Sequence, residues 1–120
     1  MMRITLKGCP PSLNKFAGRE NTWQYREEKT AWTNAVIFTA RACKDRPARP
    51  YGMADVVIMY YFPKRNRHDP DNYCGKFLLD GLTKAGVIVD DDMDHIRLHI
   101  GGNYDRKNPR TVITITEVTE

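Results

Sequence analysis

One nearly continuous apolar run constrains this chain more than any other feature. Residues 55–62 read Asp-Val-Val-Ile-Met-Tyr-Tyr-Phe and are followed by Pro63. β-Branched and aromatic residues are enriched in strands, and an almost unbroken run of them is typical of an interior strand. The run is far shorter than the roughly 20 apolar residues that a membrane helix needs. The chain is therefore expected to build a sheet around this segment.

Hydrophobic periodicity predicts the elements around it. The predicted strands cover residues 3–7, 55–62, 95–100 and 111–118. The predicted helices cover residues 25–43 and 69–85, the second with Pro70 in its first turn and Gly86 as its terminator. Gly101-Gly102-Asn103 reads as a turn region. The order β-α-β-α-β-β predicts an α+β fold, in which a mixed sheet of about four strands packs with two helices.

Length and composition limit what else the chain can hold. At 120 residues and 41% hydrophobic content, residues 1–120 are expected to form a single domain with one core. The first residues lack an apolar stretch of signal-peptide length, so we expect a cytoplasmic protein without membrane partners. The three cysteines are scattered and form no CxxC pair, which argues against a zinc site.

Charge is distributed unevenly along the chain, whose formal net charge is +4. Seven of the fifteen acidic residues fall between positions 69 and 94. Apart from these seven, eight acidic residues stand against nineteen Lys and Arg, a formal charge of +11. Phosphates and carboxylates repel each other unless a cation lies between them. This pattern indicates a protein that holds a polyanion against a divalent cation.

The first acidic group closes a basic connection, Arg65-Asn66-Arg67-His68-Asp69-Pro70-Asp71-Asn72. Mg²⁺ takes oxygen ligands and commonly uses one or two protein carboxylates together with substrate phosphate. Asp69 and Asp71 beside arginines therefore make a candidate metal and phosphate site. Asp69 followed by Pro70 is equally a good helix N-cap with a first-turn proline, and the local sequence alone leaves both interpretations open.

The second acidic group, Asp90-Asp91-Asp92, follows the second predicted helix. A chain that turns back into the sheet along residues 87–89 could bring this group to the first one, although such a run is also common in solvated turns. A calcium loop is excluded, because the twelfth position counted from Asp90 is Gly101 and not Glu. His95 and His99 are expected to lie on a polar sheet face or to contact phosphate, and not to form a metal pair.

Several short motifs of this chain, taken together, are specific enough to indicate a protein family. They are Pro10-Pro11-Ser12-x-Asn14, Asp69-Pro70-Asp71-Asn72, Lys76, Asp80-Gly81-Leu82, Gly86-Val87-Ile88 and Asp90-Asp91. In order and spacing the chain resembles the RusA family of phage and prophage Holliday-junction resolvases. The resemblance implies a Mg²⁺-dependent endodeoxyribonuclease, with Mn²⁺ as a substitute, which works as a homodimer on four-way junctions in recombination, repair or phage DNA processing. A junction of near two-fold symmetry needs two symmetric incisions, which agrees with a dimer.

The resemblance also assigns roles to residues. Asp69, Asp71 and Asp91 correspond to the metal-binding carboxylates of the family, Lys76 to its essential lysine, and Asp90 and Asn72 to supporting positions. We expect Lys64, Arg65 and Arg67 to grip phosphates, and Asn72 and Asn14 to contact DNA as well. Asp92 and Asp94 have no counterpart in the pattern and should be more dispensable.

One spacing departs from the family. The family pattern is Asp-Asn-x-x-Lys, whereas three residues, Tyr73, Cys74 and Gly75, separate Asn72 from Lys76 here. On a helix that starts at Asp69, Lys76 could point back toward the metal site or could pair with Asp80. Two other functions remain open from sequence: a catalytically idle nucleic-acid-binding dimer whose carboxylates only cap a helix, and a metal nuclease that acts on flaps or forks.

Overall fold

The computed structural model describes residues 1–16, 22–73 and 75–119. Its strands and α-helices are β1 (Met2–Lys7), α1 (Thr22–Ala42), β2 (Ala54–Phe62), α2 (Lys76–Lys84), β3 (Ile96–Tyr104) and β4 (Arg110–Glu117). Two short 3₁₀ helices, η1 (Leu13–Phe16) and η3 (Pro70–Asn72), precede α1 and α2 respectively. The predicted α+β class and the order β-α-β-α-β-β are confirmed.

The strands form one mixed sheet in the order β1-β4-β2-β3. β2 pairs in parallel with β3, from Ala54 opposite Ile96 to Phe62 opposite Tyr104, and antiparallel with β4. The β-rich run recognised in the sequence is therefore an interior strand, as predicted. Because β2 and β3 are parallel, the connection from one to the other must return along the sheet, and α2 makes that return.

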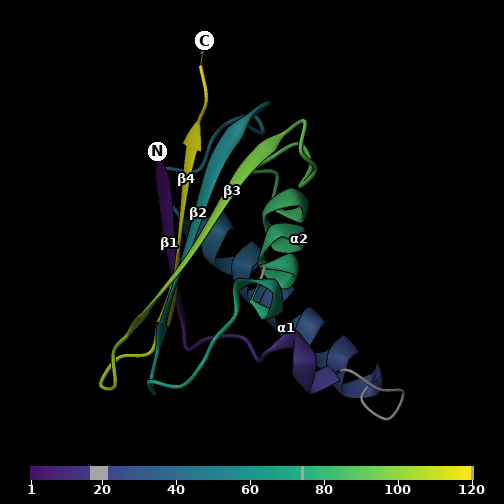
Figure 1. Ribbon diagram of the computed structural model, residues 1–120. Helices are drawn as coiled ribbons and strands as arrows, with labels where there is room; N and C mark the ends of the chain where they lie inside the picture. The colour runs from purple at the N-terminus through teal and green to yellow at the C-terminus, as the bar shows by residue number, and fades with distance from the viewer. Residues whose placement is uncertain (17–21, 74, 120) are drawn as a thin grey trace.

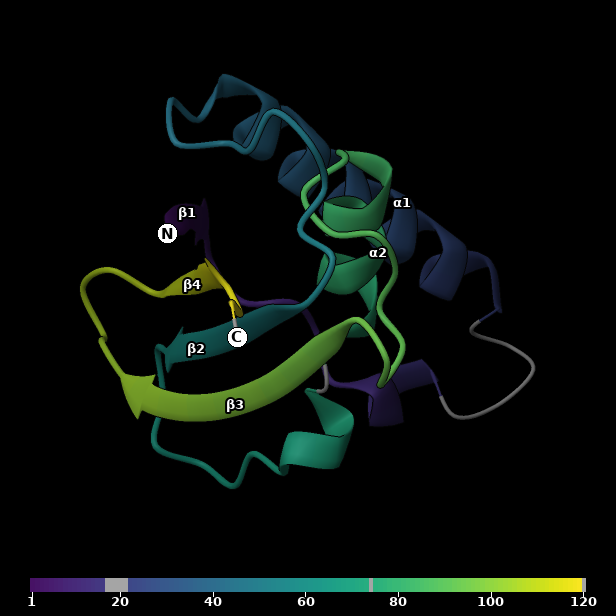
Figure 2. The ribbon, with the colours of Figure 1, turned by 90° about the horizontal axis from the view of Figure 1, so that it is seen from above.

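Both α-helices lie against the same face of the sheet (Figures 1 and 2). Alternate residues of β2 are buried beneath them, including Val56, Ile58 and Tyr60. α2 approaches α1 closely at Gly81, where a Cβ atom would collide with Val36. The buried hydroxyl of Thr33 on α1 donates a hydrogen bond to the carbonyl of Phe77 at 3.1 Å. No helix in the described ranges is long and apolar enough to cross a membrane.

The second helix starts later than its periodicity predicts, so the expectation of a helix from Asp69 is wrong at that end. Gly75 has φ +78°, a left-handed conformation that interrupts the path between η3 and α2. A Cβ atom at Gly75 would also run into the side chain of Ile58. The apolar stripe from Cys74 to Ala85 concealed this break, because its spacing is nearly unchanged across the glycine. Asp71 therefore lies in η3 with Asp69 at its N-cap position, and Lys76 is the first residue of α2.

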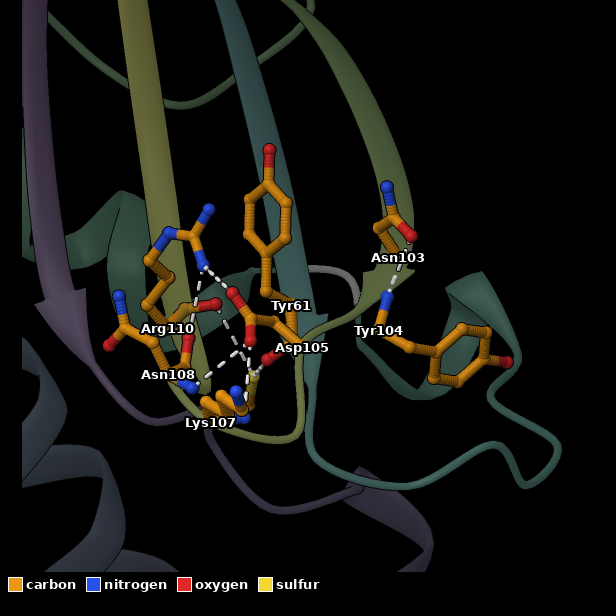
Figure 3. A network of polar contacts seen from close by, with 8 residues as sticks. Tyr61, Asn103, Tyr104, Asp105, Lys107, Asn108 and Arg110 are labelled. Carbon is orange, nitrogen blue, oxygen red and sulfur yellow. Dashed lines mark hydrogen bonds and ion pairs between the residues drawn. The ribbon is translucent and has the colours of Figure 1, made fainter.

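The turn expected at Gly101-Gly102-Asn103 is also wrong, because β3 continues through these residues to Tyr104. Register with β2 extends the strand, since Gly101 pairs with Met59 and Gly102 with Tyr60. The reversal into β4 comes at residues 105–109 instead. There the Asp105 carboxylate accepts hydrogen bonds from the backbone N–H groups of Lys107 and Asn108, each at 3.1 Å (Figure 3).

Candidate active site

The loop that leaves β2 carries the predicted phosphate contacts. Lys64, Arg65 and Arg67 are all exposed, as a phosphate grip requires. Arg67 Nε donates to Asp69 Oδ1 at 3.0 Å. That hydrogen bond and the charge of Asp69, with a smaller contribution from Asp71, raise the pKa of Arg67. An ion pair this exposed stabilises the fold little, so Arg67 can exchange its carboxylate for a phosphate at low cost.

Asp69 does not act as the helix cap that its sequence suggested. It occupies the N-cap position of η3, but its side chain makes no capping hydrogen bond. η3 has only three residues, and its backbone bonds run from Asn72 N–H to Asp69 C=O and from Tyr73 N–H to Pro70 C=O. The carboxylate of Asp69 therefore points to Arg67 and not to the helix end, while that of Asp71 is exposed.

Asp91 lies in the loop between α2 and β3, in a less hydrated setting. Burial raises its pKa first, and a hydrogen bond with Asp90 and the charges of Asp80 and Asp90 raise it further. Asp90 Oδ1 accepts the backbone N–H of Asp91 at 2.8 Å. Asp80 reaches this neighbourhood from α2 and is paired with Lys29 Nζ at 3.5 Å. Negative charge is thus concentrated around Asp91 beyond what Lys29 neutralises.

The two acidic groups occupy opposite ends of α2. η3 lies before its amino end and the loop with Asp90 and Asp91 follows its carboxyl end (Figure 1). The nine residues of α2 span roughly 14 Å. Across residues 1–16, 22–73 and 75–119, no three His, Cys, Asp or Glu side chains lie close enough together to hold a metal ion. The structure therefore does not bring the two acidic groups together as the sequence had suggested, and Asp69 with Asp71 and Asp90 with Asp91 remain separate pairs of carboxylates.

Lys76 lies between these groups at the start of α2 and is exposed. Together with Asn72 it lines a small hollow of about 20 Å³, which Pro10, Pro11 and Leu13 line from the other side. The first family motif thus packs against the segment that carries the metal and lysine motifs. The backbone of Asn14 lies in η1, while its side chain falls outside the part of the chain that the structure describes. Asp80, the alternative partner of Lys76, pairs with Lys29 instead.

At the end of the loop between α2 and β3, Asp92 pairs with His95. Asp92 Oδ1 and His95 Nδ1 are in close contact, and this hydrogen bond is the main reason why the pKa of His95 is raised. His95 precedes β3, whose first residue is Ile96, and His99 is exposed on the strand. The structure thus gives Asp92 a local partner in His95.

A pocket beside Asp69 was missed by sequence reasoning. It encloses about 230 Å³ between the ends of β2 and β3 and the segment around His68. Its lining residues are Tyr60, Phe62, His68, Asp69, Pro70, Tyr73, Ile100, Gly101, Gly102 and Tyr104. The available signal was the same-face spacing of Tyr60 and Phe62 together with the Gly101-Gly102 pair on the neighbouring strand, but those glycines were interpreted as a turn.

A fold with one helical layer on a mixed sheet, carrying two carboxylate groups and an arginine-rich loop, is suited to an enzyme that acts on a phosphodiester. The comparison with protein families agrees, since residues 8–116 match the model described as endodeoxyribonuclease RusA. The protein is thus an enzyme that hydrolyses DNA. It belongs to the RusA family of Holliday-junction resolvases, whose members act on branched DNA and generally depend on a divalent metal. No curated protein matches the chain.

Proposed function

We propose that this protein resolves four-way DNA junctions as a homodimer by Mg²⁺-dependent phosphodiester hydrolysis, with Mn²⁺ as a substitute. The observation that carries the proposal is the concentration of carboxylates around Asp91, whose backbone N–H donates to Asp90 Oδ1 at 2.8 Å and whose pKa is raised by burial and by the neighbouring Asp90 and Asp80. A fold gains no stability from such an arrangement. It is useful where a cation supplies the missing positive charge.

The donor set fits a hard divalent cation. Asp69, Asp71 and Asp91, with Asp90 in support, offer only carboxylate oxygens, and Mg²⁺ commonly needs one or two of these beside phosphate and water. When bound, the ion would supply activation of water and stabilisation of the leaving oxygen.

The residues of the chain itself perform the rest of the task. Lys64, Arg65 and Arg67 bind phosphates and place the scissile strand beside Asp69. Arg67 is already poised on Asp69 at 3.0 Å, so DNA binding would transfer this guanidinium to phosphate. Lys76, at the start of α2, offsets charge on the phosphodiester as it is attacked. The formation of a homodimer gives the two incisions that a junction of two-fold symmetry requires.

The carboxylates provide the decisive test. Asp69→Asn, Asp71→Asn and Asp91→Asn should each abolish cleavage of a labelled four-way junction in Mg²⁺ but leave junction binding intact or tighter. Each change removes a metal ligand together with a charge that repels phosphate. Binding is measured in EDTA by gel shift, and Asp94→Asn serves as the matched control. A variant that still cuts at the wild-type rate removes its residue from the site.

The remaining alternatives have their own measurements. The idle DNA-binding dimer depends on Asp69 as a helix cap, and the Asp69 side chain makes no capping bond. Wild-type cleavage with Mg²⁺, set against EDTA, decides between an enzyme and a binding protein. Competition among junction, flap, fork and duplex substrates tests junction preference. Sedimentation of the free protein tests the homodimer.

A further inference from the structure

The aromatic pocket beside Asp69 has a composition that the hydrolytic reaction alone does not require. Five of its lining residues carry aromatic rings: Tyr60, Phe62, His68, Tyr73 and Tyr104. Its volume of about 230 Å³ is below the roughly 300–1,000 Å³ of pockets that hold drug-sized ligands. The space therefore suits one flat ring system and not a larger ligand.

The rings are organised around His68. Its imidazole stacks on Phe62 with centroids 3.6 Å apart and planes 10° from parallel. Tyr73 meets the same imidazole edge-on at 5.4 Å, and Tyr104 lies at 6.2 Å. His68 Nδ1 is buried and has no hydrogen-bond partner among the described atoms. Burying an unpaired ring nitrogen is costly for packing alone, and such a group calls for an explanation from function.

The side of the pocket formed by β3 is kept open by a missing side chain. Gly102 has an ordinary, negative φ, so the backbone itself does not require glycine there. A Cβ atom at this position would lie 3.3 Å from the Phe62 ring, which itself lines the pocket. Glycine weakens a strand, and in a strand interior it often marks the close approach of a ligand or another backbone. Gly102 therefore lets the Phe62 ring lie close to β3 and leaves this stretch of the pocket wall without a side chain.

The rim of the pocket is basic and borders the proposed cleavage site. The Arg65 guanidinium lies 4.9 Å from the centroid of the Tyr104 ring. Tyr104 is 38% exposed, and its ring extends away from the β3–β4 turn (Figure 3). Asp69, paired with Arg67, is itself part of the lining. A ring that enters here would thus be attached to a phosphate held by the arginines, which is the chemistry of a nucleotide within a strand.

We propose that this pocket receives one unstacked nucleobase of the strand that is cut, with Tyr104 and His68 as its stacking and reading residues. The inference rests on the proposed cleavage of branched DNA and adds a means of selecting the branch. Extruding a base costs least where pairing or stacking is already incomplete. Bases at the branch point meet that condition, whereas bases inside a duplex do not. The pocket would thus favour positioning of the phosphodiester near a branch over one in plain duplex.

Photo-cross-linking tests the pocket directly on the full wild-type chain. Junctions with 5-iodouracil at single positions near the branch, and a single-stranded oligonucleotide with the same base, are irradiated in EDTA so that no strand is cut. The expected result is a cross-link at one junction position, mapped by mass spectrometry to Tyr104 or His68, and the same cross-link with the single strand. Bound DNA that cross-links only to other peptides overturns the inference.

Four variants provide a second readout. Tyr104→Ala removes a ring and Gly102→Val fills the pocket, whereas Tyr104→Phe keeps the ring. Phe38→Ala, which truncates a 77% exposed aromatic side chain on α1, is the matched control. The first two should weaken junction binding at least about fivefold, the low end of what one base–aromatic stack contributes. Tyr104→Phe should bind more tightly than Tyr104→Ala because it keeps the stacking ring, and Phe38→Ala should bind as the wild type does.

An abasic nucleotide at the cross-linking position separates a base pocket from a general effect on folding. Wild-type protein should bind that junction about as weakly as Tyr104→Ala binds the intact one, and the abasic change should add nothing further in Tyr104→Ala. Equal effects of the abasic nucleotide on both proteins would contradict the proposal.

If the wild type forms the cross-link but cuts no junction, the proposed function fails while the pocket stands. If Gly102→Val cuts junctions and loses affinity for the abasic junction as the wild type does, the pocket fails while the proposed function stands.

Discussion

At the scale of the residue, one extra position before Lys76 changes where its side chain lies relative to Asp69. In a continuous helix from Asp69, Lys76 would lie on the same helix face as Asp69. The left-handed conformation of Gly75 interrupts that helix. Lys76 instead opens α2 and shares a hollow with Asn72. Its long side chain can extend back past the helix start, because side chains in helices lean toward the amino end. The extra residue is thus absorbed in the left-handed turn before α2.

We predict that Lys76→Ala gives a folded protein that binds junctions but cuts them at least about 100-fold more slowly, the order expected for the loss of one positioned electrostatic group. The measurement is single-turnover cleavage in Mg²⁺ alongside a gel shift in EDTA. Lys84→Ala, which removes an exposed lysine from the last turn of the same helix, is the control and should cut normally. Wild-type turnover in Lys76→Ala would restrict catalysis to the carboxylates.

At the scale of the element, the break at Gly75 separates η3, which carries Asp71, from α2, which begins at Lys76. It combines φ +78° with a position where a Cβ atom would meet Ile58 on β2. The segment from Asp69 to Tyr73 can therefore leave the axis of α2 and pack beside Pro10 and Pro11. Glycine is required at this position for both its backbone and its lack of a side chain.

Gly75→Ala is expected to lower the free energy of unfolding by at least about 1 kcal/mol, since a left-handed conformation alone costs an L-residue roughly that much. Urea denaturation followed by circular dichroism measures the effect. Gly52→Ala is the matched control, because φ at Gly52 is not positive and nothing lies near its missing Cβ atom. A Gly75→Ala protein as stable as the wild type would argue against the break.

The turn between β3 and β4 is held by Asp105. Its carboxylate accepts Arg110 Nη1 at 2.8 Å, while the guanidinium of Arg110 lies 3.8 Å from the ring centroid of Tyr61 (Figure 3). The hydrogen bond from Arg110, followed by that from the Asn108 backbone, holds the pKa of Asp105 below its ordinary value of 3.8. A lowered folded-state pKa means that the ionised carboxylate favours the folded state. That contribution is present above pH 3.8 and is lost as the pH falls through the lower folded-state pKa.

Asp105→Asn should therefore be less stable than the wild type at pH 7, and the difference should shrink below pH 3.8. Asparagine can still accept the two backbone N–H groups, so the substitution isolates the charged pair with Arg110. Urea unfolding of both proteins at pH 7, 5 and 3 makes the comparison. A difference that is independent of pH would show that the turn does not depend on the ionised carboxylate.

At the scale of the whole molecule, the distribution of charge matters more than its total. The net charge of +4 hides a formal +11 outside the seven clustered carboxylates. Part of this positive charge lies in an exposed loop at the pocket end of the sheet, on Lys64, Arg65 and Arg67. DNA held in this way displaces counterions, and its affinity must fall as salt increases.

Junction affinity measured in EDTA should thus decline steeply between low and physiological salt. Replacing Arg65 and Arg67 together by Ala should reduce the slope of log affinity against log salt by up to ~2, because each phosphate contact contributes about 0.9. Affinity should fall alike for branched DNA of different sequences. A flat salt response of the wild type would contradict a DNA partner held by phosphate contacts.

Local patterns in the sequence determined the order of the elements, the interior position of β2 and the residue types of the candidate site. Alternation and helical spacing are properties of residues close in sequence, and they are visible without the fold. The Asp-x-Asp pair and the Asp90-Asp91 pair are local in the same sense. Their chemistry, oxygen ligands beside basic residues, follows from the residue types and their spacing alone.

Only the tertiary structure decided what these residues stand next to. The parallel register of β2 and β3 places Gly102 opposite Tyr60, and it creates a pocket where the sequence suggested a turn. The left-handed Gly75 separates Asp69 from the helix that Lys76 begins, and the fold brings Asp80 of α2 near Asp91. Such contacts join residues that are distant along the chain. They arise from the packing of whole elements against one another, which no local periodicity encodes.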